Sequence, residues 1–333
     1  MPEELLDAPS EQARPNAVFW LIAFSLAGVL LYFSLRGVDW VRVWALLRQA
    51  RLSFVVAALS IMSVDLLLRS LRWRVLLSTQ TRIPAADVFW ATSVGYLGNN
   101  FLPARAGELI RSAMISRRSG LTKTFVLTTA LCERIVDAIA LIIIGAVVLL
   151  WLPTQPGWLA DAAGPLAVGG LVGATGLIMI PFLEPFWGRL LEKLPLPQRL
   201  RARAERTLAQ GILGLRSFHD RGRLTRYILL TTIIWSLDGL TVIVGARAIG
   251  LEVPLSVAFL LITGLGLSSA LPSTPGYVGV YQFVAVTVLT PFGFSQSDAI
   301  AYILLFQAMT YVVFLCFGLT GLWRSQGGLR RVE

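Results

Sequence analysis

The chain has 333 residues, of which 56% are hydrophobic and 14% are charged, and its mean hydropathy is +0.71. Soluble globular domains are about a quarter charged, so this composition argues against an ordinary soluble enzyme and predicts a membrane protein. The net charge of +10 is expected to meet anionic lipid headgroups rather than nucleic acid, because the cations belong to so apolar a chain.

Six apolar runs predict transmembrane helices, each of which needs about 20 residues to cross the hydrocarbon core. In chain order they are residues 17–35, 53–68, 124–152, 163–183, 227–246 and 298–323. Between the first two, residues 36–51 carry four arginines set among apolar residues. This pattern predicts a short helix that lies in the membrane interface.

Two further apolar stretches are each broken at a Leu-Pro dipeptide. Residues 88–103 end in the first break and are followed by the polar run 105–118, which cannot face lipid. Residues 255–272 end in the second break, and after Ser-Thr-Pro-Gly the chain continues through 277–292. Irregular backbone is tolerated at membrane depth only where protein or water surrounds it, so both stretches are predicted to be re-entrant helical hairpins. The expected fold class is an all-α polytopic membrane protein with about six full spans and two hairpins.

Lysine and arginine are concentrated in residues 185–226, which hold ten of them, whereas the loop 153–161 has none. Cytoplasmic loops carry the excess of positive charge, so the basic segment is predicted to be cytoplasmic and amphipathic, lying on anionic lipid. Counting spans from it places both termini in the cytoplasm. The predicted organisation is a tail at 1–16, one integral membrane domain at 17–325 and a tail at 326–333. The four arginines of 36–51 then fall on the outer side, which leaves the orientation of that segment open.

A weak internal repeat runs through the chain. One unit is a span with Asp65, a hairpin, and a span with Glu133 and Asp137. The other is a span with Asp238, a hairpin, and a span with Gln307. By the charge count the two hairpins enter from opposite sides, which favours an inverted repeat with a site near the midplane, as in secondary transporters. The alternative is that two Leu-Pro breaks arose independently.

The second half of each hairpin is predicted to start just after its Leu-Pro break, with its N-terminus pointing into the membrane. Ser273 or Thr274 is expected to cap the second of these helices, with Pro275 at its first position and Gly276 next to it. Unpaired N–H groups and the positive end of the helix dipole suit an anion, so two such termini together predict a phosphate site. The alternative is that these prolines and glycines only permit tight packing.

Three charged residues, Glu133, Arg134 and Asp137, stand in the middle of the predicted span 124–152. Each costs ~2.5–3.5 kcal/mol at the bilayer centre, so such a group needs a reason. One hypothesis is a polar cavity in which Arg134 binds a phosphate while the carboxylates balance its charge or relay protons. The other is a buried salt-bridge network between helices, with Arg134 and Asp137 paired at i,i+3. Asp65 and Asp238 admit the same two interpretations.

The run that starts at Asn99 carries Arg105, Glu108 and Arg111 at intervals of three, which puts them on roughly one face of a helix. Arginine can bond two phosphate oxygens at once, so this face is a candidate for contact with a lipid headgroup. An internal Arg-Glu-Arg ladder that stiffens the hairpin is the alternative. The candidate substrate-binding residues are Asn99, Asn100, Arg105, Glu108, Arg111, Glu133, Arg134, Asp137, Asp238, Ser273, Thr274 and Gly276.

No catalytic residue, metal site or cofactor is expected. Cys132 and Cys316 lie in separate apolar runs, and the single histidine, His219, lies in the basic segment, where it is expected at the surface. The sequence also carries no nucleotide-binding or metal-binding motif. We therefore expect a protein that is not an enzyme, with any transport downhill, coupled to an ion gradient or assisted by a partner.

Four short elements, taken in order, resemble those of a known family. They are Arg72-Trp73-Arg74, Asn99-x-x-x-Pro103-x-Arg105-x-Gly107-Glu108, Glu133-Arg134-x-x-Asp137 and Pro272-Ser273-x-Pro275-Gly276-x-x-Gly279. Together they resemble the flippase-like membrane region of bacterial lysylphosphatidylglycerol synthases, over nearly the whole chain.

The resemblance implies a multi-pass protein of the bacterial inner membrane that moves, or helps to move, an anionic, aminoacylated or lipid-linked glycan phospholipid between leaflets. Full-length synthases carry a soluble aminoacyl-transferase domain after the membrane region, and this chain is expected to lack it because it ends at Glu333. Some stand-alone members are associated with hopanoid or polyprenyl-linked glycolipid pathways, which leaves the substrate open. The expected partners are membrane phospholipids or a lipid-linked substrate, and a separate lipid-modifying enzyme. The alternatives are a membrane-embedded enzyme and an accessory scaffold of such a pathway.

Overall fold

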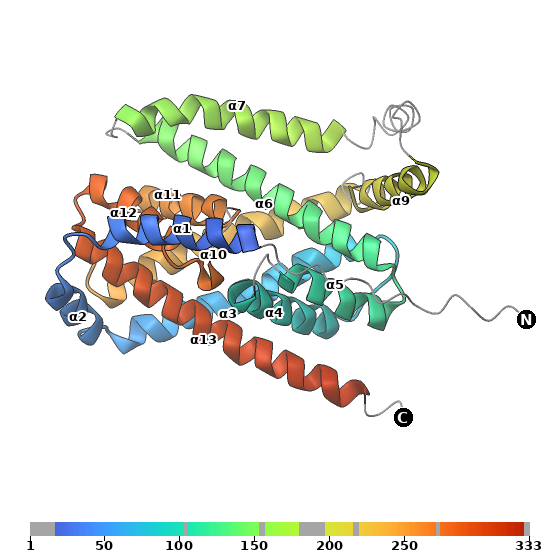
Figure 1. Ribbon diagram of the computed structural model, residues 1–333, viewed down its shortest axis with the longest axis horizontal. Helices are drawn as coiled ribbons and strands as arrows, with labels where there is room; N and C mark the ends of the chain where they lie inside the picture. The colour runs from blue at the N-terminus through green and yellow to red at the C-terminus, as the bar shows by residue number, and fades with distance from the viewer. Residues whose placement is uncertain are drawn as a thin grey trace, which may run out of the picture.

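The computed structural model describes residues 17–102, 106–152, 157–179, 197–215, 220–270 and 274–329. Every regular element in these ranges is helical, in agreement with the predicted fold class (Figure 1). The elements are α1 (Ala17–Leu35), α2 (Trp40–Arg48), α3 (Leu52–Leu77), α4 (Ala85–Phe101), α5 (Ala106–Ser119), α6 (Lys123–Trp151), α7 (Gly157–Met179), α9 (Gln198–Leu215), α10 (Arg221–Ala248), α11 (Leu255–Ser268), η4 (Pro275–Tyr277), α12 (Val280–Leu289), η5 (Thr290–Phe292) and α13 (Gln296–Leu329). The predictions for Arg105, His219 and Ser273 fall outside the described residues.

Four helices of the described ranges, α3, α6, α10 and α13, are long and apolar enough to cross a membrane. α1 and α2 form a bent pair that meets the same criteria together, with an angle of 87° between the two helices. α2 corresponds to the predicted interfacial helix within 36–51. Asp39 caps its first turn, and Arg42 donates to Asp298 at the start of α13 at 2.9 Å. The bend between α1 and α2 is therefore held by a contact with α13.

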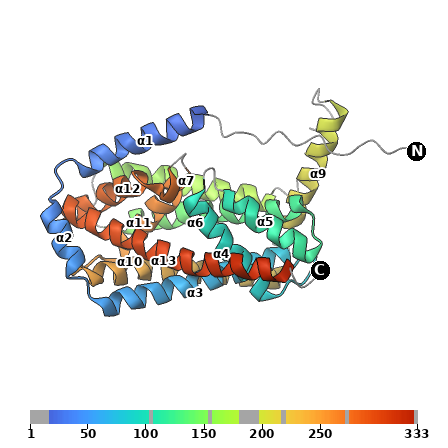
Figure 2. The same ribbon diagram turned by 60° about the horizontal axis from the view of Figure 1, so that its bottom comes forward.

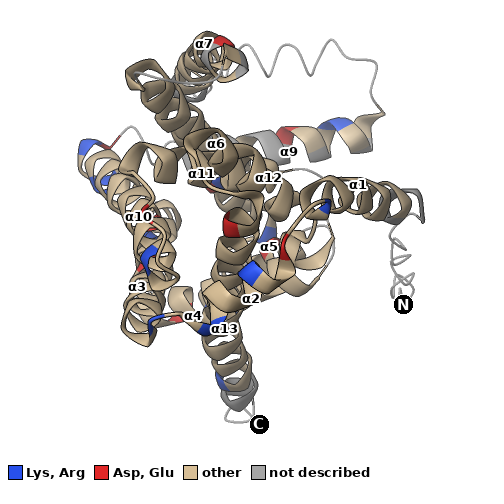
Figure 3. Cartoon of the chain, turned by 90° about the vertical axis from the view of Figure 1, so that its left-hand side faces the viewer, with Lys and Arg blue, Asp and Glu red and all other residues tan. Residues whose placement is uncertain are grey.

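Apolar side chains face outward in this protein, and several charged side chains face inward. Leu21, Val41 and Leu171 are more than half exposed, whereas Arg72 and Arg111 are fully buried. Charged residues occupy few positions along the helices, which are the blue and red segments of the ribbon in Figure 3. Hydrocarbon can solvate the first kind of side chain but not the second, so this distribution is the one expected of a multi-pass membrane protein.

Two sets of four helices pack on each other in a reciprocal pattern. The positions of these helices can be followed in Figures 1 and 2. The first set is α3 to α6 and the second is α10 to α13. α3 packs along its counterpart α10, α6 packs on α11, and α13 packs on α4. The second arm of each hairpin, α5 or α12, packs on the last helix of its own set. Exchanging the two sets reproduces these contacts, which supports the predicted repeat.

The first hairpin consists of α4 and α5, which cross in close contact. A β-carbon on Gly107 would lie 1.9 Å from the Gly95 carbonyl oxygen and 2.7 Å from the Asn99 backbone nitrogen. Both neighbours are backbone atoms that cannot turn aside, so the crossing requires glycine. Asn99 and Asn100 lie in the last turn of α4, which continues to Phe101.

The second hairpin differs from the prediction at its tip. α12 begins at Val280 with Gly279 as its N-cap, and Pro275 lies in the separate 3-10 turn η4. The prediction that Thr274 and Pro275 start the return helix is therefore wrong. Gly276 and Gly279 have φ angles of +71° and +88°, which a right-handed helix cannot contain, so the regular helix begins only after them.

α3 runs past the predicted span 53–68 and ends at Leu77. The prediction stopped at the first arginine, but Arg69 and Arg72 lie inside the bundle, where carboxylates of other helices pair with them. α7 and α10 also begin earlier than predicted, at Gly157 and Arg221. The helices are thus longer than their apolar runs.

Candidate functional site

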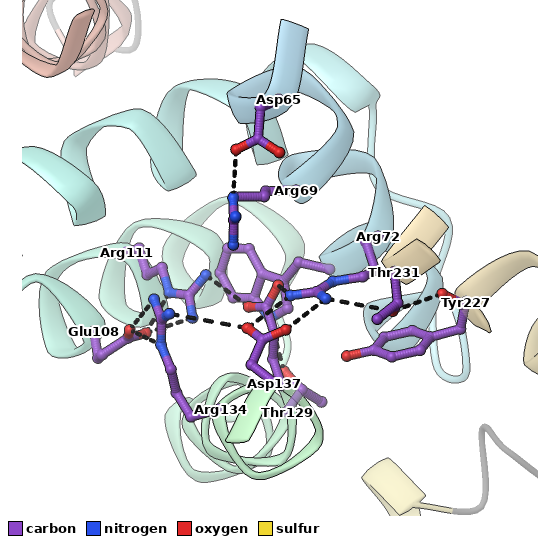
Figure 4. A network of polar contacts seen from close by, with 12 residues as sticks. Asp65, Arg69, Arg72, Glu108, Arg111, Thr129, Arg134, Asp137, Tyr227 and Thr231 are labelled. Atoms are coloured by element: carbon purple, nitrogen blue, oxygen red, sulfur yellow. Dashed lines mark hydrogen bonds and ion pairs between the residues drawn. The ribbon is translucent and has the colours of Figure 1, made fainter. Parts of the chain in front are cut away.

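Arg72 on α3 is the centre of a buried ion-pair network (Figure 4). Its Nη1 and Nη2 donate to the two carboxylate oxygens of Asp137 at 2.6 and 2.9 Å, and Nη2 also donates to Glu133 Oε1 at 3.0 Å. Nη1 further donates to Thr231 Oγ1 at 3.3 Å. One guanidinium therefore joins α3 to α6, which carries both carboxylates, and to α10.

Arg111 on α5 extends the network into the first hairpin. Its Nη1 donates to Glu133 Oε2 at 3.0 Å, so each oxygen of Glu133 is bonded to a different arginine. Its Nε donates to Glu108 Oε2, one turn earlier on α5, at 2.5 Å. The Glu108–Arg111 part of the predicted ladder is thus present, and Glu133 ties it to α6.

Arg134 on α6 binds the other oxygen of Glu108. Its Nε and Nη2 lie 2.8 and 2.7 Å from Glu108 Oε1. Its Nη1 lies 4.0 Å from Asp137 Oδ2, outside hydrogen-bond distance, so the expected i,i+3 pair is only a weak contact. The members of this hairpin network are Arg72, Glu108, Arg111, Glu133, Arg134 and Asp137, three arginines and three carboxylates.

Each arginine of the hairpin network also lies against an aromatic ring. The guanidinium carbons lie 4.3 to 5.4 Å from the ring centroids, which is within cation–π range. The pairs are Arg72 with Tyr227, Arg111 with Trp73, and Arg134 with Tyr96. The rings stabilise cations that have lost their hydration on burial.

Arg134 is the arginine at which the hairpin network opens to the outside. Its side chain is 26% exposed, against 0% for Arg72. Two buried polar atoms near it make no hydrogen bond among the described residues, namely the Tyr96 hydroxyl and Asn99 Oδ1. The amide of Asn99 donates to Glu108 Oε1, the same oxygen that Arg134 binds, at 3.2 Å. Buried polar groups in proteins are normally bonded, so unpaired ones beside a partly exposed guanidinium point to a polar ligand.

The carboxylates of the hairpin network already accept hydrogen bonds from arginines. Both oxygens of Glu133 and Glu108 and both oxygens of Asp137 are occupied in this way. Within the described ranges, no group of three or more His, Cys, Asp or Glu is placed to hold a metal ion. Nη1 of Arg134, on the partly exposed side chain of the network, lies 4.0 Å from Asp137 Oδ2 and is not bonded to it. The arrangement is therefore suited to an anion.

A second ion-pair cluster lies between α3 and α10. Arg69 Nε donates to Asp65 Oδ2 at 2.6 Å, and Arg69 Nη2 donates to Asp238 Oδ2. The guanidinium carbon also lies 5.3 Å from the centroid of the Trp235 ring. We call Asp65, Arg69 and Asp238 the α3–α10 cluster. Arg69 lies one turn before Arg72, so the cluster is adjacent to the hairpin network.

The tips of the two hairpins lie next to each other. η4 packs on α4, and the ring of Phe101 at the end of α4 lies 5.7 Å from that of Tyr311 on α13. The Tyr311 hydroxyl and Gln307 Nε2 both donate to the Gly276 carbonyl oxygen, at 3.2 and 2.8 Å. The described end of α4 thus lies next to the turn η4 of the second hairpin. At this contact the second hairpin contributes a carbonyl oxygen that is already hydrogen-bonded.

Of the ten predicted candidates that the structure describes, it brings six together and places four elsewhere. Those that it gathers are Asn99, Glu108, Arg111, Glu133, Arg134 and Asp137. Asp238 belongs to the α3–α10 cluster, and Asn100 donates to a carbonyl oxygen of its own helix. Thr274 donates to the Val278 carbonyl oxygen at the tip of the second hairpin, where Gly276 also lies.

Three residues with central positions were missed by the choice of candidates: Arg69, Arg72 and Tyr96. Arg69, Arg72 and Leu76 continue a helical spacing beyond residue 68. This spacing is the signal from which the extension of α3 past its apolar run could have been predicted. Tyr96 precedes Asn99 by three residues on α4, so it shares a helical face with a residue that was selected.

Comparisons with known proteins agree with this architecture. The family model for the lysylphosphatidylglycerol synthase TM region matches residues 20–318. The chain is similar to "Glycosyltransferase AglD" of Haloferax volcanii, with 26% identity over 80% of this chain and 47% of that protein. It is also similar to "UPF0104 membrane protein MJ1078" of Methanocaldococcus jannaschii, with 22% identity over 66% of this chain and 90% of that protein. The chain thus spans about half the length of AglD. The family match runs from α1 through most of α13, and the chain belongs to the family of the lysylphosphatidylglycerol synthase TM region.

Proposed function

We propose that this protein is a lipid translocase that moves a lipid with an anionic, phosphate-bearing headgroup between the two leaflets of a membrane. The observation that carries the proposal is the state of Arg134. It is the partly exposed arginine of an otherwise enclosed ion-pair network, and its Nη1 lies 4.0 Å from Asp137 Oδ2, beyond hydrogen-bond distance. A headgroup phosphate is the ligand that best matches an arginine in this state.

The proposed headgroup site consists of Arg134, Tyr96 and Asn99. The phosphate takes hydrogen bonds from Arg134 Nη1 and the Tyr96 hydroxyl, and Asn99 contacts the polar group beyond the phosphate through its unpaired Oδ1. Glu133 and Asp137 act indirectly. They bind Arg72 of α3 and Arg111 of α5, and so they fix the position of α6 relative to the first hairpin. We thus assign Glu133 and Asp137 a positioning role in place of direct contact with lipid.

The location of the site supports translocation. It lies at the first hairpin, whose tip is adjacent to the tip of the second hairpin. Hairpins from the two halves of a repeat, with a site between them, are the recurring plan of proteins that give alternating access to a midplane site. On this proposal the lipid tails remain in the bilayer while the headgroup passes along the hairpin tips.

Several finer features belong to the same proposal. On this proposal the headgroup is anionic and can carry an aminoacyl or a glycan group; the name of one relative, a glycosyltransferase, supports the glycan. The protein is not an enzyme, and a separate enzyme makes the lipid that it moves. It resides in the inner membrane of its cell with both termini in the cytoplasm, because the basic residues 199–206 then face the cytoplasm.

The test is lipid translocation by the purified protein in proteoliposomes that contain a trace of acyl-labelled fluorescent phosphatidylglycerol. Dithionite bleaches label in the outer leaflet, so the bleached fraction reports translocation. Arg134→Gln is expected to slow it about 10- to 100-fold, since a charge-assisted hydrogen bond contributes ~1.5–3 kcal/mol. Arg324→Gln is the matched control, because Arg324 also lies over a ring, that of Trp90, but on α13 and outside the hairpin network.

Two outcomes would contradict the proposal. One is wild-type protein that moves no lipid, with or without an imposed pH gradient. The other is an Arg134→Gln protein that is as fast as wild type. Mass spectrometry of the recovered lipid provides the comparison with the alternative class, because a covalently altered headgroup would favour a membrane enzyme.

A further inference from the structure

The hairpin network has as many carboxylates as arginines, whereas the α3–α10 cluster has one carboxylate more than it has arginines. The hairpin network pairs three arginines with three carboxylates. The α3–α10 cluster has two carboxylates, Asp65 and Asp238, on the single guanidinium of Arg69. With all groups ionised, the cluster carries one uncompensated negative charge inside a membrane protein.

The cluster lies where the two halves of the repeat meet. Asp65 is near the middle of α3 and Asp238 is near the middle of α10, and these counterpart helices pack along each other. Arg69 follows Asp65 by one turn, but the matching position in α10, four residues after Asp238, is occupied by Val242. The second half of the repeat therefore contributes a carboxylate without its own arginine, which is the origin of the excess charge.

Asp65 has an oxygen that nothing in the described chain satisfies. Its Oδ2 accepts from Arg69, whereas its Oδ1 is buried and makes no hydrogen bond among the described residues. The residue as a whole is 8% exposed. The side chain of Asp238 is 25% exposed, so this end of the cluster is open to exchange with its surroundings. An unpaired carboxylate oxygen at such a site is costly unless it acquires a proton or another ligand.

The other charged and titratable groups around the cluster do not remove the excess. Arg72 of α3 is committed to Asp137 and Glu133 of α6, as described above. α4 contributes Tyr96 and α10 contributes Tyr227, and a phenol carries no positive charge that could offset the excess. α11, which packs on α10, has no titratable side chain in Leu255–Ser268. α13 packs on α10 with Tyr302, another phenol, next to Gly245.

We propose that the α3–α10 cluster is a proton-binding site, in which Asp65 and Asp238 share one exchangeable proton at neutral pH. Two carboxylates that occupy one site cannot both ionise without a second cation, so they hold a proton between them. The proton enters from the partly exposed Asp238 and is available to the buried Asp65. Its loss leaves a net negative charge next to Arg69, one turn from the hairpin network.

A metal cation fits the cluster less well than a proton. Hard cations such as Ca²⁺ or Mg²⁺ take about six or more oxygen ligands. The cluster offers two carboxylates, and Arg69 already binds one oxygen of each. The same arginine would repel a metal ion at close range. A proton needs only one oxygen.

The experiment is infrared spectroscopy of the purified protein in nanodiscs, which detects the C=O stretch of protonated carboxylic acids directly. The wild-type protein is expected to show such a band at neutral pH, shifted on transfer to D₂O and lost on titration to alkaline pH. Asp238→Asn leaves Asp65 and Arg69 as a balanced pair, so the band is expected to disappear; Asp65→Asn has the same expected effect. Asp298→Asn is the control, since Asp298 pairs with Arg42 outside the cluster, and the band should persist.

The outcomes separate this inference from the proposed function. Absence of a titrating band in the wild-type protein overturns the proton site, even if neither variant can be purified, and leaves a static clamp between α3 and α10. A band that survives in both Asp65→Asn and Asp238→Asn overturns it as well. The readout requires no lipid movement, so a band without translocation supports the site while the proposed function fails, and translocation without a band does the reverse.

Discussion

Arg72 on α3 donates to both carboxylate oxygens of Asp137 on α6, at 2.6 and 2.9 Å, across 65 positions of the sequence. A bidentate pair of this kind fixes orientation as well as distance. It holds α6 against α3, and so it sets where Arg134, on the same helix as Asp137, meets the first hairpin. The enclosed part of the hairpin network thus serves the part that opens outward.

Loss of Arg72 should destabilise the protein strongly. Arg72→Met is expected to lower the free energy of unfolding by ~3–5 kcal/mol, because it leaves Asp137 and Glu133 buried without their balancing charge. Steric trapping in bicelles measures this quantity. Arg118→Met is the control, since its pair with Asp87 is about one-third exposed and such pairs contribute about 0–1 kcal/mol. Equal losses in the two variants would be inconsistent with the structural role of Arg72.

The hydroxyl of Tyr96 should matter for translocation more than for folding. Tyr96→Phe keeps the ring over Arg134 and removes only the unpaired hydroxyl, so stability should be unchanged or slightly raised. Translocation of phosphatidylglycerol should fall about 10- to 100-fold, because a hydrogen bond to an anionic phosphate contributes ~1.5–3 kcal/mol. Tyr302→Phe is a matched control, because its hydroxyl is also buried without a partner among the described residues but lies at the α10–α13 contact. Equal rates for wild type and Tyr96→Phe would remove this contact from the proposed site.

The crossing of α4 and α5 should not tolerate a side chain at Gly107. Gly107→Ala places a methyl group 1.9 Å from the Gly95 carbonyl oxygen, and relief requires the helices to separate. We expect a loss of ~1–3 kcal/mol or more in the free energy of unfolding. Gly169→Ala on α7 meets open space and should cost nothing measurable. A Gly107→Ala protein with wild-type stability would show that the hairpin arms do not cross this closely.

The tip of the second hairpin should loosen when Gln307 is replaced. Gln307 accepts from Gln282 at 2.7 Å and donates to the Gly276 carbonyl oxygen at 2.8 Å. Gln307→Leu leaves a buried amide of Gln282 unpaired, which costs ~1–3 kcal/mol. Hydrogen–deuterium exchange in peptides that cover residues 274–283 should increase. Thr310→Val, which removes only a bond to its own helix, should leave the exchange unchanged, and a similar increase in both variants would count against the Gln307 contacts.

The limits of prediction are clearest at helix ends. The apolar run 17–35 matches α1, and the run 124–152 differs from α6 by one residue at each end. In both cases the helix ends within a residue of the point where the apolar side chains end. The run 53–68 stops nine residues before α3 does. A local hydropathy scale counts Arg69 and Arg72 as unfit for the membrane, and it cannot register that carboxylates on distant helices neutralise them.

The hairpins show a similar division. α4 ends at Phe101, directly before the first Leu-Pro, whereas α11 ends at Ser268, three residues before Leu271. The start of α12 could not be placed from Pro275, because a proline suits the first turn of a 3-10 turn as well as that of an α-helix. The positive φ angles of Gly276 and Gly279 decide the matter. Gly279 lies against the backbone of Ala27 on α1. A β-carbon built on Gly279 would be 2.4 Å from the Ala27 carbonyl oxygen, so the position requires glycine.

Local composition by itself determined that the chain is an all-helical membrane protein with two interrupted helices and charged residues at depth, because hydropathy and proline act within a few residues. Only the packing of helices decided which charges neutralise each other. Arg72 faces Glu133 and Asp137, and Arg69 is shared by Asp65 and Asp238. Ion pairing falls off with distance in space, and spacing along one chain does not reveal the distance between residues of different helices.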